Sequence, residues 1–253
     1  MAKRPVRNSI NKYNNLSAQQ QEIKDSVLEL FNHCPLPDPE KLDHLGMYLG
    51  RMQMQRIITL AELYKLILNQ QGIIIEFGTR WGYNVALFTM LRGIFEPYVR
   101  SRKIVGFDTF EGFLNPGGND GEKSVKGDFG VTEGYKDYLH RLIKCLEQQS
   151  PIAHISKYEL VQGDAVKEAA RYLKNNPQTI IALVYFDMNL YEPTKKCLEM
   201  VRPYMPKGSV VVFDQLNYQD HPGETVAFRE VFGVSQKVCR TPISSSISYI
   251  VLE

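Results

Sequence analysis

The chain has 253 residues, 43% of them hydrophobic and 23% charged, and its 30 basic and 28 acidic residues give a formal net charge of +2. These values are typical of a globular protein with one large domain, or one domain with additions, and give no reason to expect nucleic acid or a membrane surface as a partner. No apolar run of 18 residues, secretory signal or paired-cysteine motif is visible, so we expect a cytoplasmic protein without a membrane-spanning helix, a zinc site or a redox motif.

Residues 1–70 are predicted to form a helical N-terminal extension. The polar residues 1–16 are expected to be a mobile tail. A capping serine, Ser17, and apolar residues at helical spacing predict a helix over 18–32, which a run of three prolines ends. A second amphipathic helix is predicted over 48–70, and we expect the extension to pack beside or over a ligand site.

Residues 73–82 are the stretch around which the rest is organised. Three isoleucines lead into Glu76 and then into two glycines four positions apart, which predicts a buried strand, a tight turn and a helix that begins near Asn84. The spacing E-x-G-x-x-x-G is not the dinucleotide fingerprint. An acid at the strand end favours a ligand with a cation there, such as the ammonium and sulfonium groups of S-adenosylmethionine. A turn without a ligand is the alternative.

Four further apolar runs each end in an acidic residue. They are residues 104–108, 158–164, 180–187 and 209–214, which end in Asp108, Asp164, Asp187 and Asp214. With helices between them they predict a parallel α/β sheet, and ligands bind at the carboxyl ends of such strands, so the five carboxylates are expected to converge on one crevice. Asp108 is predicted to accept hydrogen bonds from ribose hydroxyls and Asp164 from an adenine amino group. Each could also be a cap or turn residue.

The second predicted domain, residues 71–253, includes an unusual segment after its second strand. Residues 111–157 are interpreted as a lid-like insertion, a glycine-rich loop followed by a helix over 133–149, and a simple surface excursion is the alternative. The segments 236–240 and 246–252 are predicted to form a C-terminal hairpin.

Several strings carry a resemblance to a known family. They are Glu76-Phe77-Gly78-Thr79-Arg80-Trp81-Gly82, Gly106-Phe107-Asp108-Thr109-Phe110-Glu111-Gly112, Phe186-Asp187-Met188-Asn189-Leu190-Tyr191-Glu192-Pro193-Thr194 and Gly208 to Asn217. Over about residues 50–235 the chain resembles class I S-adenosylmethionine-dependent methyltransferases, and within them the macrocin O-methyltransferase family, which methylates sugars such as nucleotide-linked deoxysugars. The resemblance implies a Rossmann-like sheet of five parallel strands plus a C-terminal hairpin.

The resemblance also implies roles for matched positions. Glu76, Gly78 and Thr79 would hold the methionine part of S-adenosylmethionine, and Asp187 would lie beside it. Asp108 and Thr109 would bind the ribose, and Asp164 and Ala165 the adenine. Family members commonly hold magnesium with aspartates after the fourth and fifth strands, which correspond to Asp187 and Asp214.

The chain departs from the family pattern at two of these positions. Asn189 stands where the fourth-strand motif often has a second aspartate, and Gln215 stands where the fifth-strand pair has one. Magnesium prefers charged oxygen ligands, and an amide cannot accept a proton, so metal dependence and the identity of the base become open questions. Candidate bases are Asp187 and His221, and Tyr191 and Asn189 are candidates for contacting the acceptor.

The resulting hypothesis is a methyltransferase that methylates a hydroxyl of a small-molecule sugar in natural-product biosynthesis. Its predicted cofactors are S-adenosylmethionine and, where the resemblance to the family extends to the metal, magnesium. The resemblance further suggests a homo-oligomer with the N-terminal helices as contact surface. Three alternatives stay open: an N-methyltransferase for an aminosugar, a nicotinamide-dependent oxidoreductase and a non-catalytic S-adenosylmethionine-binding descendant.

Overall fold

The computed structural model describes residues 16–244 and 246–253, so the tail expected over residues 1–16 falls outside the described part except for its last residue. Within that part, none of the helices has both the length and the apolar character needed to cross a membrane.

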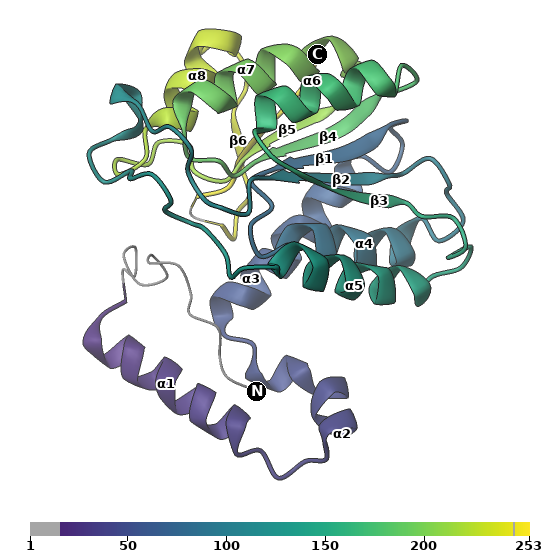
Figure 1. Cartoon of the computed structure of the whole chain (residues 1–253), viewed down its shortest axis with the longest axis vertical. Helices are drawn as coiled ribbons and strands as arrows, with labels where there is room; N and C mark the ends of the chain where they lie inside the picture. Colours follow the sequence, from purple (N-terminus) through teal and green to yellow (C-terminus); the bar gives the residue numbers. More distant parts are fainter. Residues whose placement is uncertain (1–15, 245) are drawn as a thin grey trace.

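The N-terminal helices fall into two groups. The first comprises α1 (Ala18–Asn32), α2 (Asp38–Asp43) and the 3-10 helix η1 (Leu45–Tyr48), which bury none of their residues. Figure 1 shows α1 and α2 standing away from the body, and we call residues 16–50 the arm. The following helix, α3 (Arg51–Leu66), instead buries Leu60, Leu63 and Tyr64 in the core. The predicted extension therefore divides into an exposed arm and a core helix.

A seven-stranded sheet forms the centre of the molecule, in the order β3-β2-β1-β4-β5-β7-β6. Its strands are β1 (Ile73–Phe77), β2 (Ile104–Asp108), β3 (Tyr158–Gln162), β4 (Ile181–Phe186), β5 (Val210–Phe213), β6 (Cys239–Arg240) and β7 (Ser248–Val251). Strands β1 to β5 are parallel, whereas β7 runs antiparallel to β5 and pairs with β6 as a short hairpin. The Rossmann-like α/β fold expected from the sequence is confirmed.

Helices cover both faces of the sheet. Figure 1 shows α3, α4 (Tyr83–Phe95) and α5 (Tyr135–Gln148) on one face. The other face carries α6 (Ala165–Asn175), α7 (Tyr191–Val201) and α8 (Gly223–Phe232). Successive strand residues feed opposite layers, since Ile74 packs with α3 and α4 and Ile75 packs with α6 and α7. All six residues of β4 are buried, as a doubly covered strand requires.

Four phenylalanines lie in register across the central strands, immediately before the site. Phe77 pairs with Phe107 and with Phe186, and Phe186 pairs with Phe213. Their ring centroids are 5.1, 5.3 and 5.5 Å apart along the row, all within one buried cluster. We call this row the phenylalanine ladder. Because each ring is followed by Gly78, Asp108, Asp187 or Asp214, the ladder aligns the ends of the four strands.

The segment 111–157 also has two parts. Its helix, α5, contributes Leu139 and Ile143 to the core beside α4, as an ordinary crossover helix between β2 and β3 does. The helix is preceded by a loop, residues 109–134, which includes the 3-10 turn η2 (Gly118–Asp120). A last 3-10 turn, η3 (Arg202–Tyr204), follows α7.

Candidate active site

A cavity of about 680 Å³ opens at the carboxyl ends of the parallel strands. Its lining comes from the turns after β1, β2, β4 and β5, the starts of α6 and α7, the loop 109–134 and one residue of α3. Among the predicted site residues, those that line it are Gly78, Asp108, Thr109, Asp164, Ala165, Asp187, Asn189 and Asp214. Its volume is in the range usual for small-molecule sites.

The end of β1 holds a buried carboxylate, and the turn that follows it holds a close backbone approach. Glu76 is 1% exposed, and its Oε2 has no hydrogen-bond partner among the described residues. Burial, followed by the charge of Asp187, raises the pKa of Glu76 to about 8. Gly78 has φ +94°, and a Cβ there would lie 2.0 Å from the carbonyl oxygen of Asp187, so only glycine fits. An unpartnered buried carboxylate oxygen beside a glycine turn fits a cationic ligand group such as an ammonium.

Thr79 lies under this turn rather than in the cavity. Its Oγ1 is buried without a hydrogen-bond partner in the described residues, and it would lie 2.5 Å from a Cβ at Gly106. Thr79 therefore packs against β2, and it supports the turn from below. Its neighbour Arg80 does line the cavity, with its guanidinium 4.9 Å from the centre of the Phe129 ring.

Asp108 organises the turn after β2. Its carboxylate accepts hydrogen bonds from the backbone N–H of Arg80 at 2.8 Å and of Phe110 at 2.5 Å. Burial raises the pKa of this carboxyl from its ordinary value. Thr109 closes the same turn, since its Oγ1 accepts from Glu111 N at 3.0 Å and donates to Gly112 O at 2.8 Å. Each Asp108 oxygen has a second lone pair that ribose hydroxyls can use.

Asp164 is the N-cap of α6 as well as a cavity residue. Its Oδ1 accepts from Val166 N at 3.0 Å and Lys167 N at 3.1 Å, which leaves Oδ2 for a ligand beside Ala165. The cap and the predicted contact with a base are therefore compatible.

Arg56 of α3 reaches the carboxylates at the ends of β4 and β5. Its Nη1 lies 3.1 Å from Asp214 Oδ1 and its Nη2 lies 3.4 Å from Asp187 Oδ2, while its Nε donates to Asn84 Oδ1 at 2.9 Å. Asp214 Oδ1 also accepts the hydroxyl of Tyr185 at 2.5 Å. The sequence-based prediction missed Arg56. Its place on α3 could have identified it. Arg56 precedes the buried residues Thr59 and Leu60 by three and four positions, so it lies on the same face of the helix.

Glu224 of α8 ties the two loops of this region together, and it too was missed. It is fully buried, and its carboxylate accepts from the backbone N–H of Met188 at 3.1 Å, Asn189 at 3.0 Å and Gln215 at 3.2 Å. Burial raises the pKa of Glu224 to about 8. The side-chain oxygens of Asn189 and Gln215 are buried without hydrogen-bond partners among the described residues. They offer two neutral acceptors at the cavity.

Four predicted residues are not part of the cavity lining: Glu76 and Thr79, at the end of β1 and in the turn after it, and His221 and Tyr191, whose side chains point elsewhere. His221 is 1% exposed and lies under the loop 109–134, with Nδ1 3.1 Å from Ser124 Oγ and its ring against Phe129. Burial lowers the pKa of its imidazole. Tyr191 directs its hydroxyl to Glu230 Oε2 on α8, at 2.6 Å. The side chains of His221 and Tyr191 therefore contact neighbouring elements rather than the cavity.

The loop 109–134 contributes Phe113, Leu114 and Phe129 to the cavity wall. A buried residue of this loop, Asp120, fastens it: one oxygen accepts from Tyr191 N at the start of α7 at 2.5 Å, and the other from Gly117 N at 2.6 Å. The loop also meets the segment before α8, where Lys123 pairs with Asp220 at 2.8 Å. Figure 1 shows this loop on the same side of the molecule as the start of α8.

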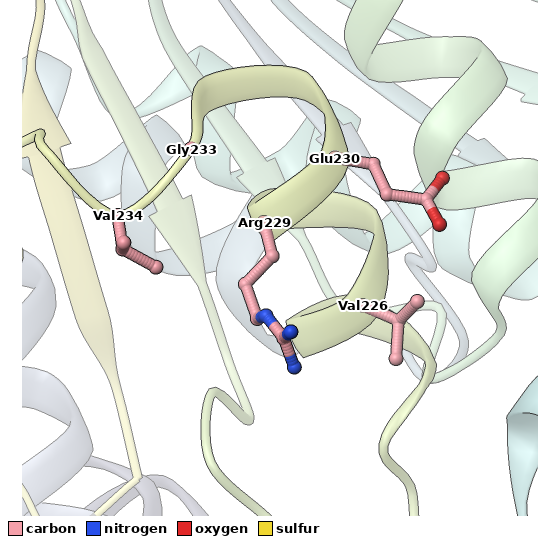
Figure 2. Close-up of a pocket in the computed structure, with 5 residues that line it drawn as sticks. All are labelled: Val226, Arg229, Glu230, Gly233 and Val234. Atoms are coloured by element: carbon pink, nitrogen blue, oxygen red, sulfur yellow. The ribbon is translucent and has the colours of Figure 1, made fainter.

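A second hollow, of about 330 Å³, lies on α8 and the turn after it. Figure 2 shows its lining residues, Val226, Arg229, Glu230, Gly233 and Val234, with the side chains of Arg229 and Glu230 pointing in different directions. The Glu230 carboxylate is already bound by Tyr191 and Lys195. None of the predicted site residues lines this hollow, so we place the candidate active site in the larger cavity.

Among solved structures, two of the similar chains are structures of the same methyltransferase, CalS11. The crystal structure of CalS11, a calicheamicin methyltransferase, is 36% identical to this chain, with a TM-score of 0.91 over 99% of each chain. The apo structure of CalS11, described as a TDP-rhamnose 3′-O-methyltransferase in calicheamicin biosynthesis, matches at 36% identity and a TM-score of 0.84 over 96% of this chain and 98% of that one. The O-methyltransferase NovP, at 17% identity and a TM-score of 0.55 over 78% and 79%, shows the fold alone. No protein-family model matches the chain, and neither does any curated protein.

Proposed function

The chain belongs to the class I S-adenosylmethionine-dependent methyltransferases, in the family that includes CalS11, and from this premise we propose that it methylates a hydroxyl of a small-molecule sugar. The observation that carries the proposal is the cavity whose ligand-facing residues, Asp108, Asp164 and Asp187, follow the strand ends of a chain 36% identical to CalS11 over 99% of both lengths. A nucleotide-linked deoxysugar is the acceptor class we propose, because CalS11 is described as acting on TDP-rhamnose.

S-adenosylmethionine is the methyl donor we propose, and it supplies a methyl group activated on a sulfonium. The unpartnered Oε2 of Glu76 would bind its ammonium, and Gly78 would let the backbone approach it, with Thr79 supporting the turn. Asp108, in the turn that Thr109 closes, would bind the ribose hydroxyls. Asp164 and Ala165 would bind the adenine. Asp108, Thr109, Asp164 and Ala165 all line the cavity.

Asp187 is the base we propose for the acceptor hydroxyl. Of the two candidates, Asp187 lines the cavity and His221 does not. Asn189 is the acceptor contact we propose, because its buried Oδ1 lacks a donor in the described residues. Holding the acceptor oxygen and the donor methyl in line is mainly a matter of position, which the rigid strand ends provide.

The magnesium implied by the family does not fit the residues of this site. Asp187 and Asp214 already hold the guanidinium of Arg56 between them, and the two other positions are the amides Asn189 and Gln215. In the described part of the chain, no three His, Cys, Asp or Glu side chains come together as a metal site.

The first test is calorimetric titration of S-adenosylmethionine into the wild type, Asp108→Ala and the control Asp137→Ala, whose side chain is exposed on α5. We expect binding by the wild type and the control and at least a tenfold loss in Asp108→Ala, about 1.4 kcal/mol or more. A folded wild type that binds no S-adenosylmethionine would overturn the proposal, and binding of a nicotinamide cofactor instead would favour the oxidoreductase.

The second test supplies acceptors, namely TDP-linked neutral deoxysugars and their amino analogues, and measures S-adenosylhomocysteine. Product from the neutral sugars supports O-methylation. Product from the amino sugars alone would assign N-methylation. Tight binding of S-adenosylmethionine without turnover of any acceptor would support the non-catalytic alternative.

We also propose that the protein is a homo-oligomer held together by the arm. Apolar side chains that a monomer leaves in water support this, since Ile23, Leu30, Leu42 and Met47 are 58, 67, 69 and 70% exposed. A cytoplasmic location and the lack of a nucleic-acid partner stay predictions from the sequence.

A further inference from the structure

Arg56 occupies the place where the family would hold a divalent cation. The guanidinium forms ion pairs with both carboxylates, at 3.1 Å from Asp214 and 3.4 Å from Asp187, and lies 5.9 Å from the centre of the Tyr185 ring. A metal held by these carboxylates would have to displace it from both. Arginine is always protonated in proteins, so the site contains a permanent positive charge that the chain itself supplies.

The arginine is fixed by its surroundings, and it is still open to a ligand. Its Nε donates to Asn84 Oδ1 at 2.9 Å, and Asn84 is 2% exposed at the start of α4. One turn further along α3, Leu60, Leu63 and Tyr64 anchor the helix in the core. The Arg56 side chain is nevertheless 27% exposed and lines the cavity. A small polar group in the cavity can therefore contact the guanidinium without a rearrangement of the fold.

The other residues at this position agree with a built-in cation. The two carboxylates of this site share one guanidinium through ion pairs, whereas family members that hold magnesium often present further carboxylate oxygens here. The positions where relatives add those oxygens carry Asn189 and Gln215, whose side-chain oxygens are neutral and accept hydrogen bonds from a ligand hydroxyl equally well.

We propose that Arg56 replaces the divalent cation, so that this methyltransferase binds and activates its acceptor hydroxyl without a metal. The proposal rests on the proposed function. The acceptor oxygen lies against the Arg56 guanidinium, within reach of Asp187. The hydroxyl proton passes to the Asp187 carboxylate as the oxygen attacks the methyl carbon of the sulfonium. An O–C bond forms, the S–C bond breaks with its electron pair going to sulfur, and the products are the methyl ether and S-adenosylhomocysteine.

Arg56 keeps its proton throughout this step. Its fixed charge stabilises the negative charge that develops on the attacking oxygen, which is the contribution that a metal makes elsewhere. Two parallel N–H groups also orient the oxygen, which a lysine at this position would not do. The structure therefore assigns to a residue of α3, outside the strand-end motifs, a direct contact with the acceptor.

The first experiment measures metal binding without turnover. Manganese, a spectroscopic substitute for magnesium, is titrated into the wild type, Arg56→Ala and the control Arg51→Ala, followed by electron paramagnetic resonance and thermal melting. Arg51 is exposed on the same helix. We expect no bound manganese in the wild type or the control, and a manganese-dependent rise of the melting temperature only in Arg56→Ala, where both carboxylates lose their cation. Binding of one manganese ion per chain by the wild type would overturn the proposal.

The second experiment measures turnover with an acceptor from the nucleotide-sugar panel. We expect a chelator to leave the wild-type kcat unchanged, and Arg56→Ala to lower kcat about a hundredfold, the size of loss usual for one charge-stabilising group. The Kd for S-adenosylmethionine should change less than threefold, and millimolar guanidinium should restore part of the lost kcat. Arg56→Lys, which keeps the charge, should lie between the two. Loss of wild-type turnover on chelation, restored by magnesium, would overturn the proposal.

The two experiments separate failure of the proposal from failure of the proposed function. If the wild type turned over no acceptor, the sugar-methylation proposal would fail, and the manganese titration would still decide whether the guanidinium keeps a metal out. If turnover occurred and needed magnesium, the function would stand and the role of Arg56 would fall.

Discussion

Glu76 is buried before any ligand binds, and that burial has a cost for the free protein. The carboxylate is 1% exposed, with one oxygen unpartnered in the described residues, and its pKa is raised to about 8. Between the unfolded pKa near 4.5 and about 8 the folded state binds the proton and the unfolded state does not. The contribution of Glu76 to stability therefore worsens as the pH rises through this window, and its full cost is present above pH 8.

The variant Glu76→Gln removes the charge and keeps the shape. We expect it to stabilise the ligand-free protein by a few kcal/mol at pH 9 and by almost nothing at pH 4.5. It should also weaken S-adenosylmethionine binding at least tenfold, because an amide does not attract an ammonium as a carboxylate does. Thermal melting at the two pH values, with calorimetry at pH 8, checks both effects. A variant that binds the cofactor as the wild type does would show that Glu76 does not contact it.

Among single residues, the sequence predicts those that stand at a recognisable place in a local pattern, such as an acid at the end of an apolar run. Glu76, Asp108, Asp187 and Asp214 follow apolar runs, and the cavity residues among them are where parallel strand ends require them to be. Arg56 could not be placed in the same way, because its reach to Asp214 depends on how α3 packs on α4, and no local pattern encodes that contact. His221 had the right distance along the chain from β5, but the loop around it turns the ring toward Ser124.

The central strands act together through the phenylalanine ladder. The ring of each strand stacks on that of its neighbour, and the residue after each ring belongs to the cavity or its wall. A change in one ring is therefore expected to disturb the ligand-binding turn that follows it, as well as the core.

Phe107→Ala tests this coupling. We expect a loss of about 3 to 5 kcal/mol in the free energy of unfolding and a weaker affinity for S-adenosylmethionine, because Asp108 follows directly. The control Leu173→Ala empties the same core from α6, with 5% exposure in the wild type, and should lower stability without changing the affinity. Urea unfolding and calorimetry give both quantities. Equal effects of the two variants on affinity would mean that the ladder supports the fold alone.

The loop 109–134 is fastened to α7 through one buried carboxylate. Asp120 accepts the N–H of Tyr191, which is the first residue of that helix. Asp120→Ala is expected to raise the rate of tryptic cleavage at Lys123 and Lys126 several-fold and to raise the KM for the acceptor, since the wall of the cavity loosens. Glu122→Ala, an exposed neighbour in the loop, is the control. Unchanged cleavage would show that other contacts hold the loop.

The sequence predicts a helix or strand well where buried residues recur at a regular spacing. It predicts less well where an element's role depends on the other elements against which it packs. The apolar runs predicted all five parallel strands, and the amphipathic spacing predicted α1 to within its capping residue Ser17. The sequence predicts residues 111–157 as one insertion because a glycine-rich loop precedes α5, whereas in the structure α5 packs as the crossover helix between β2 and β3. Only its packing on α4 distinguishes the two parts.

On the scale of the whole molecule, the arm is the part whose helices bury none of their residues. Its sequence spacing shows an apolar face, but spacing alone cannot say whether that face meets the body of the same chain. The structure places it outside the body, where α1 and α2 bury no residue. We expect Leu30→Glu with Leu42→Glu to convert the oligomer to monomers in light scattering coupled to gel filtration. The control Val234→Glu, at a site 80% exposed but outside the arm, should leave the mass unchanged. A wild type that is already monomeric would contradict the proposed assembly.

Helix α3 joins the arm to the interior as a single rod. It begins at Arg51, where the arm ends, and Arg56 follows five residues later, about 7.5 Å along the axis at 1.5 Å per residue. The arm that would contact a neighbouring copy is therefore joined to the Arg56 guanidinium by less than two turns of continuous helix. Loss of the proposed oligomer should therefore disturb the position of Arg56. Specific activity should fall when the enzyme is diluted below the dissociation constant of the oligomer, so an assay at nanomolar enzyme would give a lower kcat than an assay at micromolar enzyme.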